Sequence, residues 1–259
     1  PARYRMLPHE NRALPDFMII GTQKGGTTSL YKYLAKHPNI KSNYVVKELS
    51  FFDEYYSRGE TWYRSNFPKR KKGKLYFEGT THYLYNPLIP KRVKKMLPNV
   101  KVIALLRDPI DRAYSSYKHQ VRAGREALNF EDAIQAEPER LNGEKEKLLS
   151  DPTYISYNYN HFSYIERGKY ADQINNWLEY FPKEQILILS SKDFFKNTDN
   201  SLKQIYSFLG VEYIKTPIER KHNTGDYKDT MSEEMRIKLK LIFKPYNAKL
   251  QKILGRDFF

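Results

Sequence analysis

The chain has 259 residues, enough for one large domain with a substantial core, and 40% of them are hydrophobic, which argues against a disordered protein. Lys and Arg number 45 against 30 Asp and Glu, and the net charge of +15 favours anionic partners such as nucleotides, acidic sugars, nucleic acid or a lipid surface. The absence of cysteine excludes disulfides, thiol nucleophiles and Cys-ligated metals.

Apolar runs that alternate with helical stretches predict an α/β fold. The runs cover residues 16–21, 74–79, 100–107 and 185–190. Because helical patterns separate them, we expect one P-loop-like parallel sheet flanked by helices. The sheet and helices form a single domain over 16–259, after an irregular lead-in over 1–15.

The helical patterns are interrupted once by a weakly periodic stretch. Helices are predicted over 28–36, 87–97, 109–123, 130–136, 170–180, 201–209 and 232–254, the last of them interrupted around Pro245. Residues 138–168 are first charged and then Tyr-rich. This stretch is interpreted as a mixed helix and loop excursion, either bordering an acceptor cleft or forming a plain surface insertion.

The stretch GTQKGGTTSL, residues 21–30, lies between the first strand and the first helix. Its backbone N–H groups from Gly25 to Ser29 can bind a phosphate at a helix N-terminus. A Walker A loop has its lysine directly before the hydroxyl residue, whereas here Thr27 follows Gly26 and the lysine is Lys24. The sequence therefore predicts a phosphate cradle without the grip on a triphosphate and magnesium; the alternative is a turn needed only for packing.

A second anion site is predicted at the end of the run over 100–107. Arg107 ends this strand, Asp108 and Pro109 open a helix, and Ser115 lies about two turns into it. Ligands of open α/β sheets bind at this carboxyl end, so Arg107 and Ser115 are positioned to share an anion. The alternative is a Walker B carboxylate for magnesium, against which the preceding arginine and the missing Walker lysine both count.

Several ordered motifs carry a resemblance to a known family. KGGTTSL, KELSFFD, FEGT and LLRDPIDRAYSSY occur in this order, and YSRGETWYRSNFP, GKYADQINNWLEYFP and LGRDFF accompany them. The chain resembles the sulfotransferases that use 3′-phosphoadenosine 5′-phosphosulfate (PAPS), in pattern the heparan sulfate glucosaminyl 3-O- and N-sulfotransferases and their bacterial relatives. The resemblance implies the sulfotransferase fold, PAPS as donor, 3′,5′-diphosphoadenosine (PAP) as product, and no required metal.

The resemblance also implies a role for individual residues of the donor site. The first loop would bind the 5′-phosphosulfate, and Arg107 and Ser115 would bind the 3′-phosphate. Lys24 would stabilise the leaving phosphate. In the segment 219–228, which resembles a loop that closes over the 3′-phosphate and adenine, Lys221 and Asn223 are candidate contacts. The first-loop residues are Lys24, Gly25, Gly26, Thr27, Thr28 and Ser29.

On the acceptor side, the resemblance makes Glu48 the general base, because it matches the family's catalytic glutamate before a Phe pair. From the residues alone, Lys47 and Glu48 could instead form a surface ion pair. Two positions depart from the pattern: Gly79 stands where the 3-O-sulfotransferases carry a lysine, for which Lys47 or His82 could substitute, and Ser50 stands where they carry a histidine. Tyr170 either lies near the donor or packs on Trp177.

The acceptor is expected to be a carbohydrate, with heparan-like glycosaminoglycan as the leading example. The alternatives are a small-molecule or lipid hydroxyl and, more distantly, a P-loop kinase or a basic module that binds polyanions. Nucleic acid is not an expected partner. No run approaches the roughly 20 apolar residues of a membrane span, which with the absence of cysteine predicts a cytoplasmic protein. The alternative is a lumenal domain of a longer protein, since residue 1 is Pro.

Overall fold

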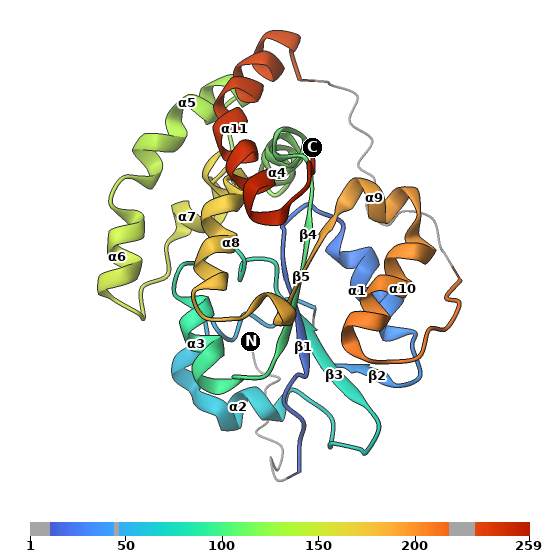
Figure 1. The fold of residues 1–259 in the computed structure, drawn as a ribbon. Coiled ribbons are helices and arrows are strands. Elements are labelled where there is room, and N and C mark those ends of the chain that lie inside the picture. The colour runs from blue at the N-terminus through green and yellow to red at the C-terminus, as the bar shows by residue number, and fades with distance from the viewer. Residues whose placement is uncertain (1–10, 44–46, 218–230) are drawn as a thin grey trace.

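The computed structural model describes residues 11–43, 47–217 and 231–259, and five parallel strands form its central sheet. The strands are β1 (Phe17–Gly21), β2 (Ile40–Ser42), β3 (Leu75–Gly79), β4 (Lys101–Leu106) and β5 (Ile186–Ser190). Their order across the sheet is β2-β3-β1-β4-β5 (Figure 1). Because all pairs are parallel, every strand ends at the same edge, the upper edge in Figure 1.

Side chains alternate between the two faces of the sheet and bury both. Phe17 and Ile19 of β1 belong to one apolar cluster, and Met18 and Ile20 belong to another. All four are at most 1% exposed. Continuous apolar runs are what a parallel sheet covered on both faces requires, which explains why these runs are not interrupted by polar residues.

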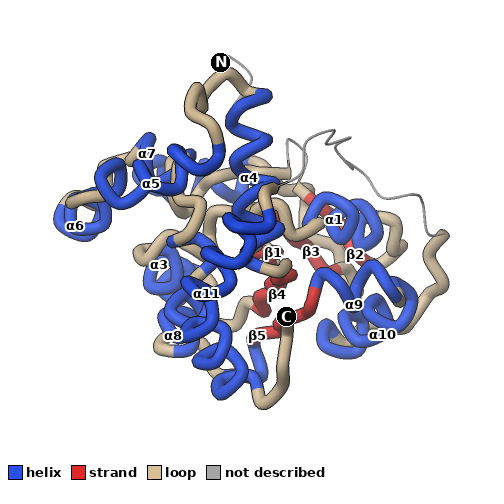
Figure 2. The backbone as a smooth tube through the Cα atoms, turned by 90° about the horizontal axis from the view of Figure 1, so that it is seen from above, coloured by secondary structure: helices blue, strands red, loops and turns tan. Residues whose placement is uncertain are grey.

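Helices cover each face of the sheet (Figures 1 and 2). The Phe17 face packs against α1 (Thr27–Ala35), α9 (Ser191–Lys196) and α10 (Thr198–Leu209). The Met18 face packs against α2 (Gly59–Ser65), α3 (Ile89–Met96), α8 (Tyr170–Leu178) and the end of α11 (Glu233–Leu254). Three short 3₁₀ turns complete these connections: η1 (Tyr56–Arg58), η2 (Glu166–Gly168) and η3 (Lys183–Gln185).

A helical layer extends beyond the sheet after β4. It consists of α4 (Pro109–Arg122), α5 (Phe130–Leu141), α6 (Glu144–Ser150) and α7 (Tyr157–His161). A separate apolar cluster joins α4 and α5 to α11 and includes Ile110, Ala133 and Phe243. The stretch 138–168 contributes the end of α5, then α6, α7 and η2, and the helices α5 and α6 lie farthest from the sheet in Figure 1.

The predicted fold class is confirmed, while some elements differ from the prediction. The four predicted strands correspond to β1, β3, β4 and β5. The sequence pattern missed β2, α2 and α9, which have three, seven and six residues and are too short to show a clear period. The predicted interruption at Pro245 is wrong, because α11 continues through it.

The continuity of α11 has a physical reason. A proline removes one backbone hydrogen bond, to the carbonyl four residues earlier, which belongs to Leu241. That residue is 67% exposed, so water can satisfy its carbonyl, while Leu239, Phe243 and Leu250 bury the other side of the helix. In the described part of the chain, neither α11 nor any other helix is long and apolar enough to span a membrane.

Candidate active site

The loop between β1 and α1, residues 22–26, is held tightly against the sheet and is called the glycine loop below. Thr22 N–H donates to the Leu105 carbonyl at 3.1 Å, and Gly25 N–H donates to the Thr22 carbonyl at 2.9 Å. A Cβ on Gly25 would lie 2.4 Å from the Leu105 carbonyl oxygen, and residue 26 has φ of 95°. Only glycine fits at these two positions, which explains the Gly-Gly pair.

The start of α1 leaves backbone donors open to an anion. Ser29 N–H already donates to the Gly26 carbonyl at 3.0 Å. Within the described ranges, no backbone carbonyl pairs with the N–H groups of Gly26, Thr27 or Thr28. Together with the positive end of the helix dipole, these three donors form an environment that fits a phosphate group.

Lys24 and Arg107 supply positive charge at this edge. Arg107 follows the last residue of β4, and its Nη1 donates to the Lys24 carbonyl at 3.2 Å. Burial lowers the pKa of Lys24, and the charges of Arg122 and Arg107 lower it further. Tyr170 holds the backbone of Arg107 in place, because its hydroxyl donates to the Arg107 carbonyl at 2.9 Å. Tyr170 also belongs to the same apolar cluster as Trp177.

Asp108 is a helix cap in this structure. Its Oδ1 accepts hydrogen bonds from the N–H groups of Ile110 and Asp111 at 2.9 and 3.1 Å. These contacts satisfy the first turn of α4, as expected for an N-cap aspartate. The alternative of a Walker B carboxylate gains no support from this geometry, and within the described residues no group of three or more His, Asp or Glu side chains is arranged to hold a metal ion.

Two neighbouring serines of α4 lie close to this edge. Ser115, which the sequence singled out, is buried with 4% exposure. Ser116, which it did not, places its Oγ 3.3 Å from Gln23 Oε1 in the glycine loop. The two other predicted donor contacts, Lys221 and Asn223, lie outside the described residues.

Glu48 is fixed at the ends of β1 and β3. Its Oε2 accepts from Thr81 N–H at 2.7 Å and from Thr81 Oγ1 at 3.2 Å. Its Oε1 lies 2.6 Å from Lys47 Nζ, and Lys47 Nζ in turn donates to Thr27 Oγ1 at 3.2 Å. The Glu48 side chain is 41% exposed. Lys47 therefore connects the predicted base to the first residue of α1, and the ion pair expected from the residues alone is part of the site.

The surroundings of Gly79 explain why a glycine stands where the 3-O-sulfotransferases carry a lysine. A Cβ at this position would lie 3.2 Å from Tyr31 Cδ2, so the Tyr31 ring occupies the space beside it. The Tyr31 hydroxyl donates to Asn43 Oδ1 at 2.8 Å, which fixes the ring. Lys47 supplies a positive charge next to Glu48.

His82 directly follows Thr81, the residue that binds Glu48. Burial lowers the pKa of His82 well below its usual range, and the positive charge of Arg167 lowers it further. Asn160 and His161 of α7 also affect the pKa of His82, so the segment 138–168 approaches this histidine. Burial, followed by the charge of Arg125, likewise lowers the pKa of His161 to about 4.

Sequence reasoning missed some supporting residues. Ser191 follows the last residue of β5, and its Oγ donates to the Gly25 carbonyl at 2.8 Å. Phe195 packs on Gly26, since a Cβ there would lie 2.5 Å from its ring. The rule that pointed to Arg107, a polar residue at the carboxyl end of a strand, applies to Ser191 as well.

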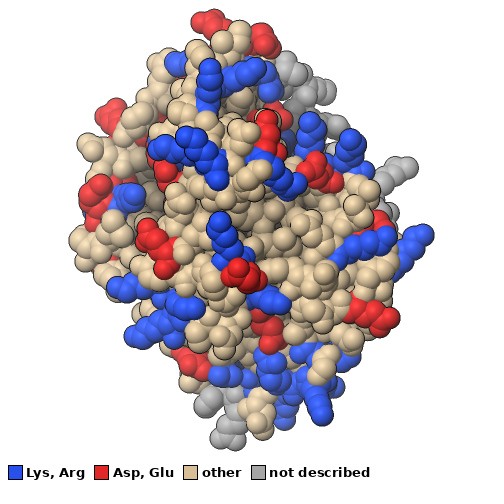
Figure 3. Space-filling view, viewed as in Figure 1, with Lys and Arg blue, Asp and Glu red and all other residues tan. Residues whose placement is uncertain are grey.

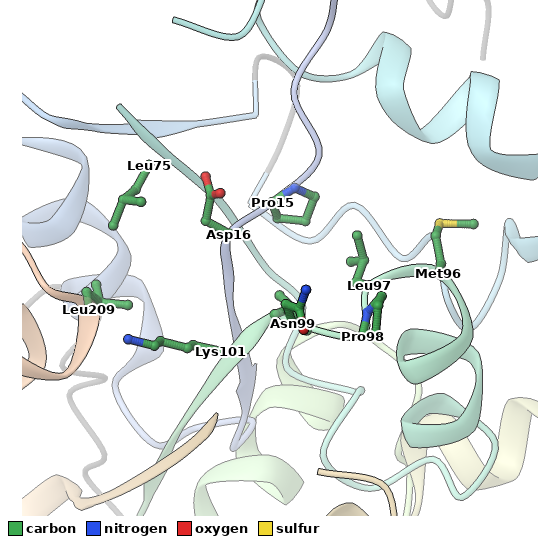
Figure 4. Close-up of a pocket in the computed structure, with 10 residues that line it drawn as sticks. Pro15, Asp16, Leu75, Met96, Leu97, Pro98, Asn99, Lys101 and Leu209 are labelled. Atoms are coloured by element: carbon green, nitrogen blue, oxygen red, sulfur yellow. The ribbon is translucent and has the colours of Figure 1, made fainter. Parts of the chain in front are cut away.

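Two hollows of the surface lie away from these residues. A cavity of about 420 Å³ is lined by Pro15, Asp16, Leu75 and Lys101 among others, and Figure 4 shows these side chains at the amino ends of β1, β3 and β4. A larger hollow of about 740 Å³ follows the edge strand β2. Neither contains a predicted donor-site residue. The basic residues that line the larger hollow are Arg12, Lys41, Lys69, Lys71 and Lys74.

Comparison with known proteins gives the relationship of this chain. The family model described as "Sulfotransferase domain" matches residues 14–219. The chain is 29% identical over 271 residues to the mouse heparan sulfate glucosamine 3-O-sulfotransferase 3B1, covering 96% of the chain and 65% of that protein. It is 35% identical over 208 residues to the human bifunctional heparan sulfate N-deacetylase/N-sulfotransferase 3, covering 76% of the chain and 22% of that protein. The chain thus spans less than two thirds of either protein.

Solved structures agree with this relationship. A sulfotransferase from Alicyclobacillus acidocaldarius superposes with a TM-score of 0.78 and 29% identity over 95% of this chain and 97% of its own. The mouse sulfotransferase SULT7A1, solved with PAP, has a TM-score of 0.57 and 16% identity over 95% and 90% of the two chains, which shows a shared fold. Since the family model covers most of the sequence and the fold agrees, the chain belongs to the sulfotransferase domain family.

Proposed function

We propose that this protein transfers a sulfuryl group from PAPS to a hydroxyl or amine of a carbohydrate acceptor. One observation carries the proposal: Lys47 Nζ contacts both Glu48 Oε1 and Thr27 Oγ1, at 2.6 and 3.2 Å. A general base and a phosphate-binding helix start therefore lie within the reach of one side chain. That is the arrangement required when an acceptor proton and a leaving phosphate must be handled at the same place.

The donor suits the two cationic positions at this edge. PAPS supplies a sulfuryl group on a 5′-phosphate and carries a second phosphate at its 3′ position. Lys24 and the N–H groups of Gly26, Thr27 and Thr28 suit the 5′ side. Arg107 and Ser115 suit the 3′ side. Gly25 and Ser29 shape the loop, and Lys221 and Asn223 stay predicted contacts.

The chain's own groups handle the proton and the charge. Glu48 accepts the acceptor's proton as the acceptor oxygen or nitrogen bonds to sulfur, a role worth about 10²- to 10⁴-fold in rate. The bond between sulfur and the 5′-phosphate oxygen breaks in the same displacement. Lys24 and the open N–H groups of α1 stabilise the negative charge on that oxygen, an effect of about 3–4 kcal/mol for a single well-placed donor. No residue in this scheme requires a metal ion.

Two observations favour a carbohydrate acceptor over a small-molecule or lipid hydroxyl. The relatives described above are named for heparan sulfate, and the net charge of +15 suits a polyanionic glycan. Lys47 pairs with Glu48, and Arg122 lies close enough to Lys24 to lower its pKa. A heparan-like glycosaminoglycan is therefore the leading acceptor.

The test is transfer of labelled sulfate from PAPS to heparosan, N-sulfated heparan, chondroitin, small phenols and hydroxylated lipids. We expect transfer to a heparan-type glycan, and transfer only to phenols or lipids would replace the acceptor part of the proposal. Thermal unfolding in the presence of PAP, or of ATP with magnesium, provides a separate check on the donor. Stabilisation by ATP with magnesium alone would contradict the donor assignment.

A further inference from the structure

A buried carboxyl group lies directly beneath the loop that carries Glu48. Glu78, in β3, is fully buried, and three hydroxyl groups surround it. Thr80 Oγ1 donates to Glu78 Oε2 at 3.1 Å, and Tyr83 OH donates to Glu78 Oε1 at 3.5 Å. Tyr63 OH, from α2, also donates to Oε1. A carboxyl in the core of a sheet is costly unless it is hydrogen-bonded in this way, so its presence calls for a role.

Two of these hydroxyls also hold the loop over residues 48–53. Ser50 N–H donates to Thr80 Oγ1 at 3.3 Å, and Phe52 N–H donates to Tyr83 OH at 3.1 Å. A hydroxyl has one proton and two lone pairs. Because Thr80 and Tyr83 give their protons to Glu78, their lone pairs are directed to the two backbone N–H groups.

The loop needs such support because its backbone is strained. Ser50 has φ of 53°, a left-handed conformation that costs a residue other than glycine about 1–2 kcal/mol. The buried Arg92 adds a further contact, since its Nη1 donates to the Phe52 carbonyl at 2.6 Å. Phe52 is thus held at both its N–H and its carbonyl, two residues after the strained position and four after Glu48.

We propose that Glu78 is a positioning residue for the reaction: it orients the hydroxyls of Thr80 and Tyr83, which hold the 48–53 loop so that Glu48 is fixed against Thr81 with its other oxygen toward Lys47. This inference rests on the proposed role of Glu48 as general base. Glu78 itself is buried and touches neither donor nor acceptor, so it acts only through the loop.

The experiment removes one hydroxyl at a time. Thr80→Val and Tyr83→Phe keep the shape of the side chain and remove the donor to Glu78, while Thr80→Ser keeps the hydroxyl. Tyr206→Phe is the matched control, because Tyr206 is also fully buried and its hydroxyl lies 3.3 Å from Thr216 Oγ1 on the opposite face of the sheet. Each variant is measured for sulfate transfer from PAPS and for the rise in Tm on adding PAP.

We expect Thr80→Val and Tyr83→Phe each to lower kcat about tenfold, the effect of one buried hydrogen bond left unmade, with the PAP-induced rise in Tm unchanged. Thr80→Ser and Tyr206→Phe should keep the kcat of the wild type. The same substitutions are then made in a Glu48→Gln background. If Thr80 and Tyr83 act through Glu48, their effect on kcat should shrink to less than about twofold there, because a positioned base is no longer present.

Wild-type kcat in both Thr80→Val and Tyr83→Phe would overturn the inference. A tenfold loss that persists in the Glu48→Gln background would also overturn it, since the hydroxyls would then act on something other than the base. Failure of the proposed function gives a different result: the wild type itself transfers no sulfate from PAPS, or Glu48→Gln alone keeps full kcat.

Discussion

Glu48 and Glu78 lie near the same strand end in opposite environments. The Glu48 side chain is 41% exposed and paired with Lys47, so it is available to an acceptor. Glu78 is fully buried, and burial raises its pKa to about 8. These surroundings fit the different tasks that we propose for the two carboxyl groups, one at the surface of the site and one beneath it.

Glu48→Gln should lower kcat by about 10²- to 10⁴-fold and leave PAP binding intact, because the amide cannot accept the acceptor's proton. Steady-state rates of sulfate transfer and PAP-dependent thermal shifts measure the two effects. Glu60→Gln is the matched control: Glu60 is 49% exposed and pairs with Arg64 at 2.6 Å in α2. If Glu48→Gln and Glu60→Gln have the same kcat, Glu48 is not the base.

Loss of the Lys24 proton should lower kcat at alkaline pH. Stabilising the leaving phosphate requires its protonated form, and burial together with Arg122 and Arg107 lowers its pKa. We expect kcat to fall with rising pH at a point below the usual lysine pKa of about 10.4. In Lys24→Arg the side chain stays charged, so the fall should move to higher pH. An unchanged pH profile in Lys24→Arg would assign the fall to another group.

Among single residues, sequence reasoning proposed those that belong to motifs and missed those that depend on contacts. Glu48, Lys24 and Arg107 stand in recognisable local patterns. The contact from Lys47 to Thr27 joins residues 20 positions apart, in a loop and at the start of a helix, and no local pattern indicates it. The resemblance pointed to Tyr170, but its hydrogen bond to the Arg107 carbonyl, 63 positions away, was not predicted.

At the scale of elements, the position of the glycine loop depends on its close approach to β4. In Gly25→Ala, the added methyl would lie 2.4 Å from the Leu105 carbonyl oxygen, so the loop must move away from the sheet. We expect this variant to lose the rise in Tm on adding PAP. Thermal unfolding with and without PAP measures it.

Gly73→Ala is the control for this prediction. Residue 73 has φ of 74° and open space around it, so a methyl adds only backbone strain of about 1–2 kcal/mol. It should lower Tm slightly and keep the full PAP effect. A Gly25→Ala protein that PAP stabilises as strongly as the wild type would show that the close approach to β4 does not shape the donor site.

The strands were predictable because a parallel sheet covered on both faces leaves long apolar runs. β2 was not, since its three residues include Lys41 and Ser42, which lie at the sheet's edge and need no burial. The prediction at Pro245 failed because the rule for proline assumes that the lost hydrogen bond is not replaced, and here the residue that carries the freed carbonyl, Leu241, is exposed, so water can replace it.

At the scale of the whole molecule, the buried Glu78 and Glu137 and the half-buried Asp53 should make stability depend on pH. Burial raises the pKa of Asp53 to about 7, that of Glu137 to about 7 and that of Glu78 to about 8. Between the unfolded pKa near 4 and these values, the folded state binds more protons than the unfolded state, so the free energy of unfolding falls as pH rises. Below about pH 6.5 the half-buried His82 and His161, whose pKa values are lowered, have the opposite effect.

The contribution of Glu137 to the pH dependence of the free energy of unfolding can be measured separately. Urea unfolding of the wild type and of Glu137→Gln from pH 5.5 to 8 should show a shallower decline for the variant up to about pH 7, because the histidines contribute equally to both. Above that pH the two slopes should agree. Parallel curves over the whole range would show that Glu137 is not protonated in the folded protein.

The distribution of charge should affect long acceptors most. Figure 3 shows Lys and Arg side chains grouped at the lower end of the molecule, near the amino end of β3 in Figure 1. In the described residues no carboxylate pairs with Lys69 or Lys71, which line the hollow beside β2. Salt screens such charges, so KM for a polyanionic glycan should rise with ionic strength.

Replacing both Lys69 and Lys71 with Ala should weaken this salt dependence of KM. The matched control replaces Lys91 and Lys95 of α3 with Ala, an equal loss of charge on exposed residues elsewhere. Initial rates from low to physiological salt distinguish the pairs. Equal effects of the two pairs would mean that only the net charge matters.

The most direct test of the central claim is the rate of labelled sulfate transfer from PAPS to N-sulfated heparan in the presence of EDTA. The two-anion site with Glu48 as base predicts transfer without metal, a loss of about 10²- to 10⁴-fold in Glu48→Gln, and a loss of about 10²- to 10³-fold in Lys24→Met. Wild-type rates in both variants would contradict this account, as would a strict requirement for magnesium.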